Sequence, residues 1–395
     1  MGCKKLYLED MKQMTANAVV ISCVPRKDGG FDVETDRTPL FPEGGGQRSD
    51  LGTMNGVKIL HCREENGTVI HHTEAPVTVG ETVEIAVDAA VRRMHTQQHT
   101  GEHMLSFAYQ QLFGAVNIGF HMSEDVVTID LDRMLTAEQI AQGEAYANEM
   151  IWDDRKVTIR TVNAEEMRGL PLRKMNDKLE GDDIRIVAID GGEMCTCCGT
   201  HFESTAPVGM VKVLDHIKYK QGCRITFACG VLALKWFCME NTELRRTAAK
   251  LSVKPDGVFE AVQRKDEQIT AVHAVLREKN AQLAGFYAEK IRSNSFERED
   301  CRIAAGIVPV DADTAKRIAE MLCEDENTLA VLFYMDGERQ KYFCMAGAAC
   351  KRSCRDVALK LNALLEAKGG GNPKTAQGSF QKTTEAVLLD AINAL

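Results

Sequence analysis

The chain has 395 residues, of which 27% are charged and 44% hydrophobic, values typical of globular proteins that exclude wholesale disorder. Acidic residues outnumber basic ones by 57 to 48, and the net charge of −9 argues against a protein that coats nucleic acid through bulk positive charge. No apolar run approaches the roughly 18 residues of a membrane span, and the N-terminal residues lack a signal-peptide core, so we expect a cytoplasmic protein without membrane association.

Residues 1–90 are predicted to form a small β-barrel domain. Short β-branched runs at 18–24, 56–60 and 77–87 are separated by turn signals, which is typical of closely connected strands. The segment 41–47, Phe-Pro-Glu-Gly-Gly-Gly-Gln, is too rich in glycine for a strand interior.

Residues 91–240 are predicted to form an α+β core. Their expected helices lie at 94–113 and 135–152, and the expected strands lie at 126–131, 156–162, 184–189 and 224–228. Because strands and helices do not alternate in a regular βαβ order, the pattern favours a mixed or antiparallel sheet over a Rossmann arrangement.

Residues 241–295 are predicted to form a helical arm, and residues 296–395 a C-terminal α/β domain, so that the whole chain belongs to the α+β class. Apolar residues recur in the arm at seven-residue spacing, namely Val262, Ile269, Leu276 and Leu283. Lys265 and Lys279 interrupt the second stripe, so the arm has half of a coiled-coil seam. An antiparallel helical hairpin and a homodimer fit this pattern equally well.

Three histidines recur at four-residue spacing on the first predicted helix of the core. His95 and His99 project from one face of that helix and can share an ion, and His103 continues the same face as a third candidate. Glutamate does not follow His95, so the metalloprotease motif is not present.

A cysteine-rich segment offers the other half of a metal site. In Cys-Thr-Cys-Cys-Gly-Thr-His at 195–201, Cys197 and His201 are four residues apart and can complete a tetrahedral nitrogen and sulfur site that suits Zn²⁺. The alternative is a redox dithiol, because Cys195 and Cys198 form a CxxC pair. The other cysteines are scattered singly, which is typical of small buried side chains in a reducing cytosol.

Motifs in series resemble a known family over essentially the whole chain. Pro-Glu-Gly-Gly-Gly-Gln at 42–47, HxxxH at 95–99 and Cys-Gly-Thr-His at 198–201 are similar to the editing domain of alanyl-tRNA synthetases and their free-standing AlaX-type relatives. Residues 368–378, with Gly-Gly-Gly-x-Pro and Ala-Gln-Gly, resemble the DHHA1-like domain that follows the editing domain in those synthetases. Cys198 departs from the family pattern, which has glycine there. With no room for an aminoacylation domain before residue 1, the resemblance implies a long, stand-alone editing protein.

The resemblance implies a Zn²⁺ site and a reaction. The implied ligands are His95, His99, Cys197 and His201, with Cys195 or Cys198 as lesser alternatives to Cys197. The implied reaction is hydrolysis of the ester that joins serine, or glycine, to alanine tRNA. A pocket that hydrogen-bonds the serine hydroxyl can discriminate against alanine, whereas an apolar pocket cannot.

The implied catalytic residues come from the predicted barrel. Thr38 matches the family threonine associated with the substrate hydroxyl, Gly45 and Gly46 would let the backbone approach the substrate, and Gln47 would contact substrate or water. The alternatives are an ordinary strand residue at Thr38 and a bulged hairpin at the glycines.

Local basic groups are candidates for tRNA contacts despite the acidic net charge. In the core these are Arg173, Lys174, Lys212, Lys218, Lys220 and Arg224. In the C-terminal domain, expected to bind tRNA or dimerise, they are Lys351, Arg352, Arg355, Lys360, Lys368 and Lys374. Competing hypotheses are a zinc hydrolase of other small esters or D-aminoacyl adducts, and a non-catalytic protein that binds tRNA or zinc.

Overall fold

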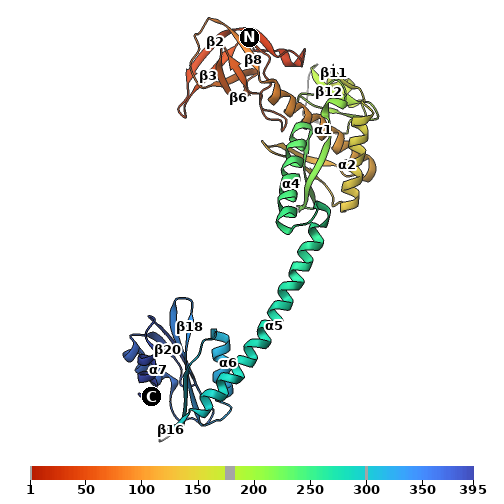
Figure 1. Cartoon of the computed structure of the whole chain (residues 1–395). Coiled ribbons are helices and arrows are strands. Elements are labelled where there is room, and N and C mark those ends of the chain that lie inside the picture. Colours follow the sequence, from red (N-terminus) through yellow and green to blue (C-terminus); the bar gives the residue numbers. More distant parts are fainter. Residues whose placement is uncertain (1, 174–182, 299–300) are drawn as a thin grey trace. The chain divides into compact units, whose positions relative to one another are not determined.

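A computed structural model describes residues 2–173, 183–298 and 301–395, and it has the mixed α+β composition that the sequence predicts (Figure 1). Contacts divide the chain into two compact units, Met1–Arg246 and Thr247–Leu395. None of the helices in the described part of the chain combines the length and the apolar character needed to cross a membrane.

The first unit begins with a closed six-stranded barrel in the order β2-β3-β7-β6-β5-β8. The strands are β2 (Thr15–Pro25), β3 (Phe31–Thr35), β5 (Gly52–Met54), β6 (Val57–Glu65), β7 (Thr68–Thr73) and β8 (Thr82–Val87). Asn55-Gly56 and Asn66-Gly67 join β5 to β6 and β6 to β7 with positive φ at both residues, the geometry of tight two-residue hairpins. Alternate side chains such as Val33 and Ile85 fill the interior. Beside the barrel, β1 (Lys4–Lys5) pairs with β4 (Arg37–Thr38) and is followed by a 3₁₀ turn (Leu6–Leu8).

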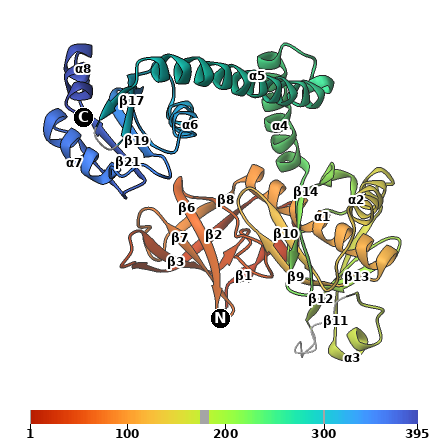
Figure 2. The same cartoon turned by 90° about the horizontal axis from the view of Figure 1, so that it is seen from below.

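The core of the first unit is built from two antiparallel sheets and their helices (Figure 2). One sheet has the order β14-β15-β10-β9, with β9 (Asn117–Met122), β10 (Val127–Leu131), β14 (Val211–Tyr219) and β15 (Gly222–Cys229). The other has the order β11-β12-β13, with β11 (Val157–Val162), β12 (Ile184–Ile189) and β13 (Glu193–Thr196). The helical segments are α1 (Ala89–Phe113), α2 (Ala137–Trp152), α3 (Ala164–Arg168), a 3₁₀ turn (Ala206–Val208) and α4 (Gly230–Leu251). The pairing is antiparallel throughout both sheets, so the expectation of a sheet other than a Rossmann sheet is confirmed.

Helix α1 is buried along most of its length, including its polar residues. The Asp88 carboxylate caps its first turn by accepting from the Ala90 and Val91 amides, and the helix ends at Gly114 in the left-handed region. The Gln98 amide both donates to and accepts from the backbone of Cys229. Because such side chains are satisfied by neighbouring backbone, a helix with little apolar periodicity can lie inside the core.

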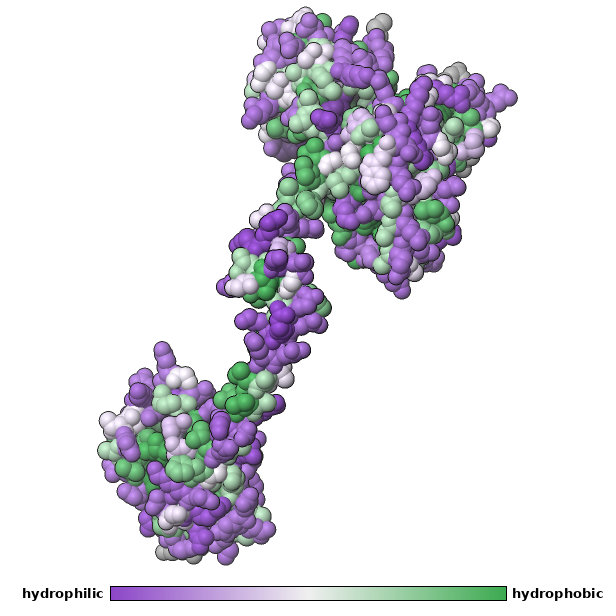
Figure 3. Space-filling view, turned by 45° about the vertical axis from the view of Figure 1, so that its right-hand side comes forward, coloured by the Kyte–Doolittle hydropathy of each residue, from purple (hydrophilic) through white to green (hydrophobic). Residues whose placement is uncertain are grey.

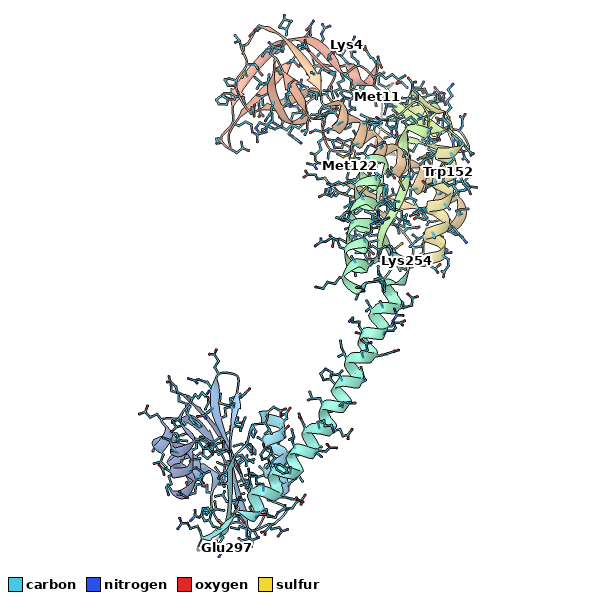
Figure 4. The ribbon with its side chains drawn as sticks, viewed as in Figure 1. Lys4, Met11, Met122, Trp152, Lys254 and Glu297 are labelled. Carbon is cyan, nitrogen blue, oxygen red and sulfur yellow. The ribbon has the colours of Figure 1, made fainter. Side chains whose placement is uncertain are left out.

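A buried ion pair fixes the barrel to α1. The Arg92 Nε atom donates to the Asp50 carboxylate over 2.8 Å, and its Nη atoms donate to the carbonyls of Pro39 and Met11. Arg92 is 2% exposed and Asp50 fully buried, so the pair is shielded from solvent. Met11 is labelled beside this part of the chain in Figure 4. The Asp50 carboxylate also accepts from the Phe41 amide, which ties the glycine-rich segment to the same joint.

The second unit is a six-stranded sheet covered by helices on both faces. The sheet order is β16-β17-β18-β19-β21-β20, with β16 (Phe296–Arg298), β17 (Cys301–Ile307), β18 (Thr328–Asp336), β19 (Arg339–Ala346), β20 (Lys368–Gly371) and β21 (Thr375–Phe380). A 3₁₀ turn (Pro255–Gly257) precedes α5 (Val258–Ser293), whose C-terminal part packs with α6 (Ala312–Leu322) on one apolar cluster. Helices α7 (Cys354–Leu365) and α8 (Glu385–Asn393) contribute to a second apolar cluster.

The predicted half-seam lies along α5, which is a single 36-residue helix. Val262, Ile269, Leu276 and Leu283 are 43%, 54%, 52% and 43% exposed. Figure 3 shows hydrophobic residues among hydrophilic ones along this helix. The stripe is therefore accessible within the chain.

Candidate metal centre

Four side chains converge in the core of the first unit. His99 and His103 come from α1, and Cys197 and His201 come from the segment after β13; their ligand atoms all lie within 4.8 Å of one another. The Cys197 Sγ atom is 3.2 Å from His99 Nε2 and 3.3 Å from His201 Nε2. The three imidazoles are buried and Cys197 is half-buried. We call these four residues the histidine–cysteine cluster.

The loop that carries Cys197 and His201 is held tightly against α1. Arg185 of β12 donates through Nη1 to the carbonyls of Cys197 and Gly199, over 2.8 Å each. A Cβ atom at Gly199 would lie 2.0 Å from Cε1 of His99. Only glycine can therefore let the loop pass this close to the His99 ring.

The cluster contains His103 and not His95, which corrects the pair chosen in the sequence analysis. All three histidines share one face of α1, but the 197–201 loop reaches that face at His99 and His103. His95 lies one turn nearer the helix N-terminus, with Asp50 and Arg48 among its charged neighbours, and its buried Nδ1 atom has no hydrogen-bond partner. Among the described residues, His95 belongs to no metal-binding group.

A buried carboxylate lies beside the Nδ1 atom of His103. Glu193 of β13 places Oε1 3.2 Å from His103 Nδ1 and accepts from Arg173 over 2.7 and 2.9 Å. Burial raises the pKa of the Glu193 carboxyl, but Arg173 and His103 lower it more, and the net shift is downward. Arg173, expected to contact tRNA, is instead an internal partner with a 6% exposed side chain, and Lys174 lies outside the described residues.

The other two imidazoles are also held at Nδ1. His99 Nδ1 is 2.6 Å from the Gln47 side-chain oxygen, and His201 Nδ1 is 3.2 Å from the Thr100 hydroxyl. With Glu193 on His103, every ring in the histidine–cysteine cluster has a partner on the side away from the ligand atoms. Such outer partners fix the orientation and the tautomer of metal-binding histidines.

The donor set fits a borderline-soft ion. Burial raises the pKa of the Cys197 thiol, but His99, His201 and His103 lower it well below its usual range, which favours a thiolate. Burial and the neighbouring His103 lower the pKa of His201 to about 3, which favours a neutral imidazole. Three imidazoles and one thiolate suit tetrahedral Zn²⁺ and do not suit Mg²⁺ or Ca²⁺, which prefer oxygen ligands.

The neighbouring cysteines lie outside the histidine–cysteine cluster. Cys195 is buried with Sγ 3.5 Å from His103 Nδ1, on the Glu193 side of the ring, and Cys198 is exposed. Both are free thiols, so the structure shows no disulfide between the two ends of the CxxC pair.

The glycine-rich segment lies beside the cluster, but its glycines face protein. Gly45 and Gly46 have φ of +59° and +85°, and a Cβ atom at Gly46 would lie 2.5 Å from the Phe120 ring. A Cβ atom at Gly45 would lie 3.1 Å from Cys198 Sγ. The glycines therefore allow the loop to pack on the core. The sequence analysis expected them to allow the backbone to approach the substrate.

Thr38, which the sequence analysis expected to contact the substrate, is hydrogen-bonded inside the barrel. Its side chain is fully buried in the barrel, where Oγ1 is 2.8 Å from His71 Nε2 and accepts from the Leu40 amide over 3.1 Å. Gln47 is also fully buried, with its side chain bonded to His99 and Thr200. Neither side chain is exposed for a substrate in this structure.

The chain is similar to curated proteins over nearly its whole length. Alanyl-tRNA editing protein Aarsd1 of Rattus norvegicus is 28% identical over 401 residues, which cover 94% of this chain and 93% of the rat protein. Alanyl-tRNA editing protein AlaX-L of Pyrococcus horikoshii is 26% identical over 407 residues, covering 99% of this chain and 98% of the archaeal protein. The chain is a homologue of the alanyl-tRNA editing proteins.

This editing-protein homologue also matches part of a larger enzyme. Alanine–tRNA ligase of Pyrococcus abyssi is 27% identical over 398 residues, which cover 97% of this chain but 42% of the ligase. No family model matches the chain. The solved C-Ala domain of Aquifex aeolicus alanyl-tRNA synthetase aligns with 25% of this editing-protein homologue at 16% identity and a TM-score of 0.23, too low to establish a shared fold.

Proposed function

We propose that the chain hydrolyses the ester of alanine tRNA that carries serine or glycine, with Zn²⁺ held by His99, His103, Cys197 and His201. The observation that carries this proposal is the histidine–cysteine cluster, preassembled in a chain that resembles alanyl-tRNA editing proteins from end to end. Zinc bound there would supply a Lewis acid that polarises the ester or orients a water molecule.

The cluster has one accessible side. The three imidazoles are buried, whereas Cys197 is half-buried and Cys198 next to it is exposed. The aminoacylated end of the tRNA therefore approaches over Cys197. The half-buried Phe120 ring lies 5.2 Å from the His99 ring and shields that imidazole from water.

The chain's outer partners keep the site ready for substrate. Glu193, Gln47 and Thr100 each hold one imidazole at Nδ1, so the rings need not reorient when the substrate arrives.

Contacts to the tRNA body are proposed for both units. Lys218 near the end of β14 and Lys220 in the turn between β14 and β15 are both exposed. In the second unit, Lys341, Lys368 and Gly369 line a cavity of about 340 Å³ at the β20 edge of the sheet. Cations beside exposed glycine backbone suit a phosphate backbone, and binding through them should weaken as salt rises.

The proposal is tested by incubating Zn²⁺-loaded protein with Ser-tRNA, Gly-tRNA and Ala-tRNA made on alanine tRNA. We expect release of serine, and of glycine, much faster than of alanine. Intact Ser-tRNA after prolonged incubation would refute the proposal. Turnover of simple amino-acid esters alone would support a general zinc esterase, and tRNA binding without release would support a non-catalytic role.

A further inference from the structure

The side chain of Gln47 reaches from the barrel into the metal centre. It is fully buried, its oxygen lies 2.6 Å from His99 Nδ1 and 2.9 Å from the Thr200 amide nitrogen, and its nitrogen donates to the Thr200 hydroxyl over 3.0 Å. The amide therefore touches both the helix and the loop that form the histidine–cysteine cluster.

The neighbours of Gln47 determine which amide atom faces which group. The Thr200 backbone N–H is always a donor, so the atom beside it must be the side-chain oxygen. His99 Nδ1 faces that same oxygen, which can only accept, and Nδ1 must carry the hydrogen. The lone pair of His99 is thus on Nε2, the atom that lies 3.2 Å from Cys197 Sγ.

We infer that Gln47 is a positioning residue for the metal centre: it fixes the tautomer and orientation of His99 and makes metal binding depend on docking of the barrel loop. This inference rests on the metal use in the proposed function but assigns Gln47 no contact with substrate. The sequence analysis expected a contact of Gln47 to substrate or water instead, and the experiment below distinguishes the two roles.

The glycine-rich loop is shaped to deliver this side chain. Gly44 and Gln47 close a tight turn through two reciprocal backbone bonds of 3.0 Å. The Gly46 carbonyl accepts from the Met122 amide over 3.1 Å, which attaches the turn to β9; Met122 is labelled in Figure 4. The positive φ values of Gly45 and Gly46 permit this turn, and their missing side chains leave room for Phe120 and Cys198.

The test compares three full-length variants by titration with Zn²⁺ against a chromophoric chelator and by the visible spectrum of the Co²⁺-loaded protein. Gln47→Met keeps the length of the side chain but removes the acceptor, and we expect Zn²⁺ affinity to fall about 10- to 100-fold with an altered Co²⁺ spectrum. Gln47→Glu keeps an acceptor for His99 and Thr200, and we expect affinity within a few fold of the unaltered chain. Gln98→Met is the matched control, because Gln98 is equally buried on α1 but bonds to the Cys229 backbone.

Each outcome decides the inference. Loss of affinity in Gln47→Met alone supports it. Unchanged Zn²⁺ binding in Gln47→Met together with lost Ser-tRNA hydrolysis would overturn it and restore a substrate contact. An equal loss in Gln98→Met would also overturn it, since the effect would then be general loosening. If the unaltered Zn²⁺-loaded chain hydrolyses no aminoacyl-tRNA, the proposed function fails while the metal titrations still report on Gln47.

Discussion

The carboxylate of Glu193 lies 3.2 Å from Nδ1 of His103, and both side chains are buried. Arg173 holds the same carboxylate through two nitrogens. Neutralising the carboxylate therefore affects two partners at once, an imidazole in the histidine–cysteine cluster and a shielded guanidinium.

We predict that Glu193→Gln destabilises the protein by about 3–5 kcal/mol, because it leaves the Arg173 charge buried without its counter-charge. The double variant Glu193→Gln/Arg173→Met should recover much of that loss. Urea unfolding of metal-free protein measures both. Equal stability of the single variant and the unaltered chain would contradict the internal pairing.

The histidine–cysteine cluster predicts which substitutions remove bound Zn²⁺. His103→Ala should lose stoichiometric Zn²⁺, whereas His95→Ala should retain it, because the structure includes only His103 in the cluster. Among the cysteines, Cys197→Ala should lose zinc and Cys198→Ala should keep it. The zinc content of the four purified variants, measured by mass spectrometry, checks these predictions. Zinc retained in His103→Ala would make His95 a proposed ligand again.

The sequence alone does not distinguish His95 from His103 as the partner of His99. Four-residue spacing places His95, His99 and His103 on one helix face, but it cannot say at which turn a distant loop will arrive. That choice is made by contacts far apart in the chain, such as Gly199 against His99. The contacts of Glu193 with His103 and Arg173 had no sequence signal, because they depend on how strand β13 packs against α1 in the folded core.

The fold was easier to predict than the roles of the glycines. Short β-branched runs separated by turn signals predict a barrel because local geometry governs closely connected strands, and the structure has one. Glycines at 45 and 46 predict close approach of some neighbour. Whether that neighbour is substrate or protein depends on tertiary packing, and the structure brings Phe120 and Cys198 there.

Substitutions at Thr38 distinguish a structural role of this side chain from a contact to substrate. His71 Nδ1 faces the Val33 carbonyl, so Nε2 accepts from the Thr38 hydroxyl, which in turn accepts from the Leu40 amide. Thr38→Val leaves those groups unsatisfied and should cost about 1–3 kcal/mol in chemical denaturation, while Thr38→Ser should cost less. Unchanged stability of Thr38→Val with lost discrimination between Ser-tRNA and Ala-tRNA would instead favour a substrate contact.

His71 should also make the stability of the barrel depend on pH. Its complete burial lowers its pKa from 6.5 to about 4. Between those values the unfolded chain takes up a proton that the folded chain does not, so the contribution is present above pH 6.5 and is lost as the pH falls toward 4. The loss amounts to roughly 3 kcal/mol.

The variant His71→Gln isolates this effect from the other buried histidines. We expect its stability to decline less than that of the unaltered chain between pH 7 and pH 4.5, as followed by urea unfolding at each pH. Parallel curves for the two proteins would show that His71 does not carry the dependence.

The apolar stripe on α5 predicts association with a second copy of the chain. Val262, Ile269, Leu276 and Leu283 repeat every seven residues and are roughly half exposed, the pattern of a helix that buries one seam against another helix. Introducing a charge at two of these positions, as in Ile269→Lys/Leu276→Lys, should remove the seam without touching either apolar cluster of the second unit. Light scattering should give twice the 43.7 kDa chain mass for the unaltered protein and the single-chain mass for the variant.

The control Val24→Lys, at an exposed barrel position, should stay dimeric. An unaltered protein that remains monomeric at high concentration would rule the arm out as a dimer seam.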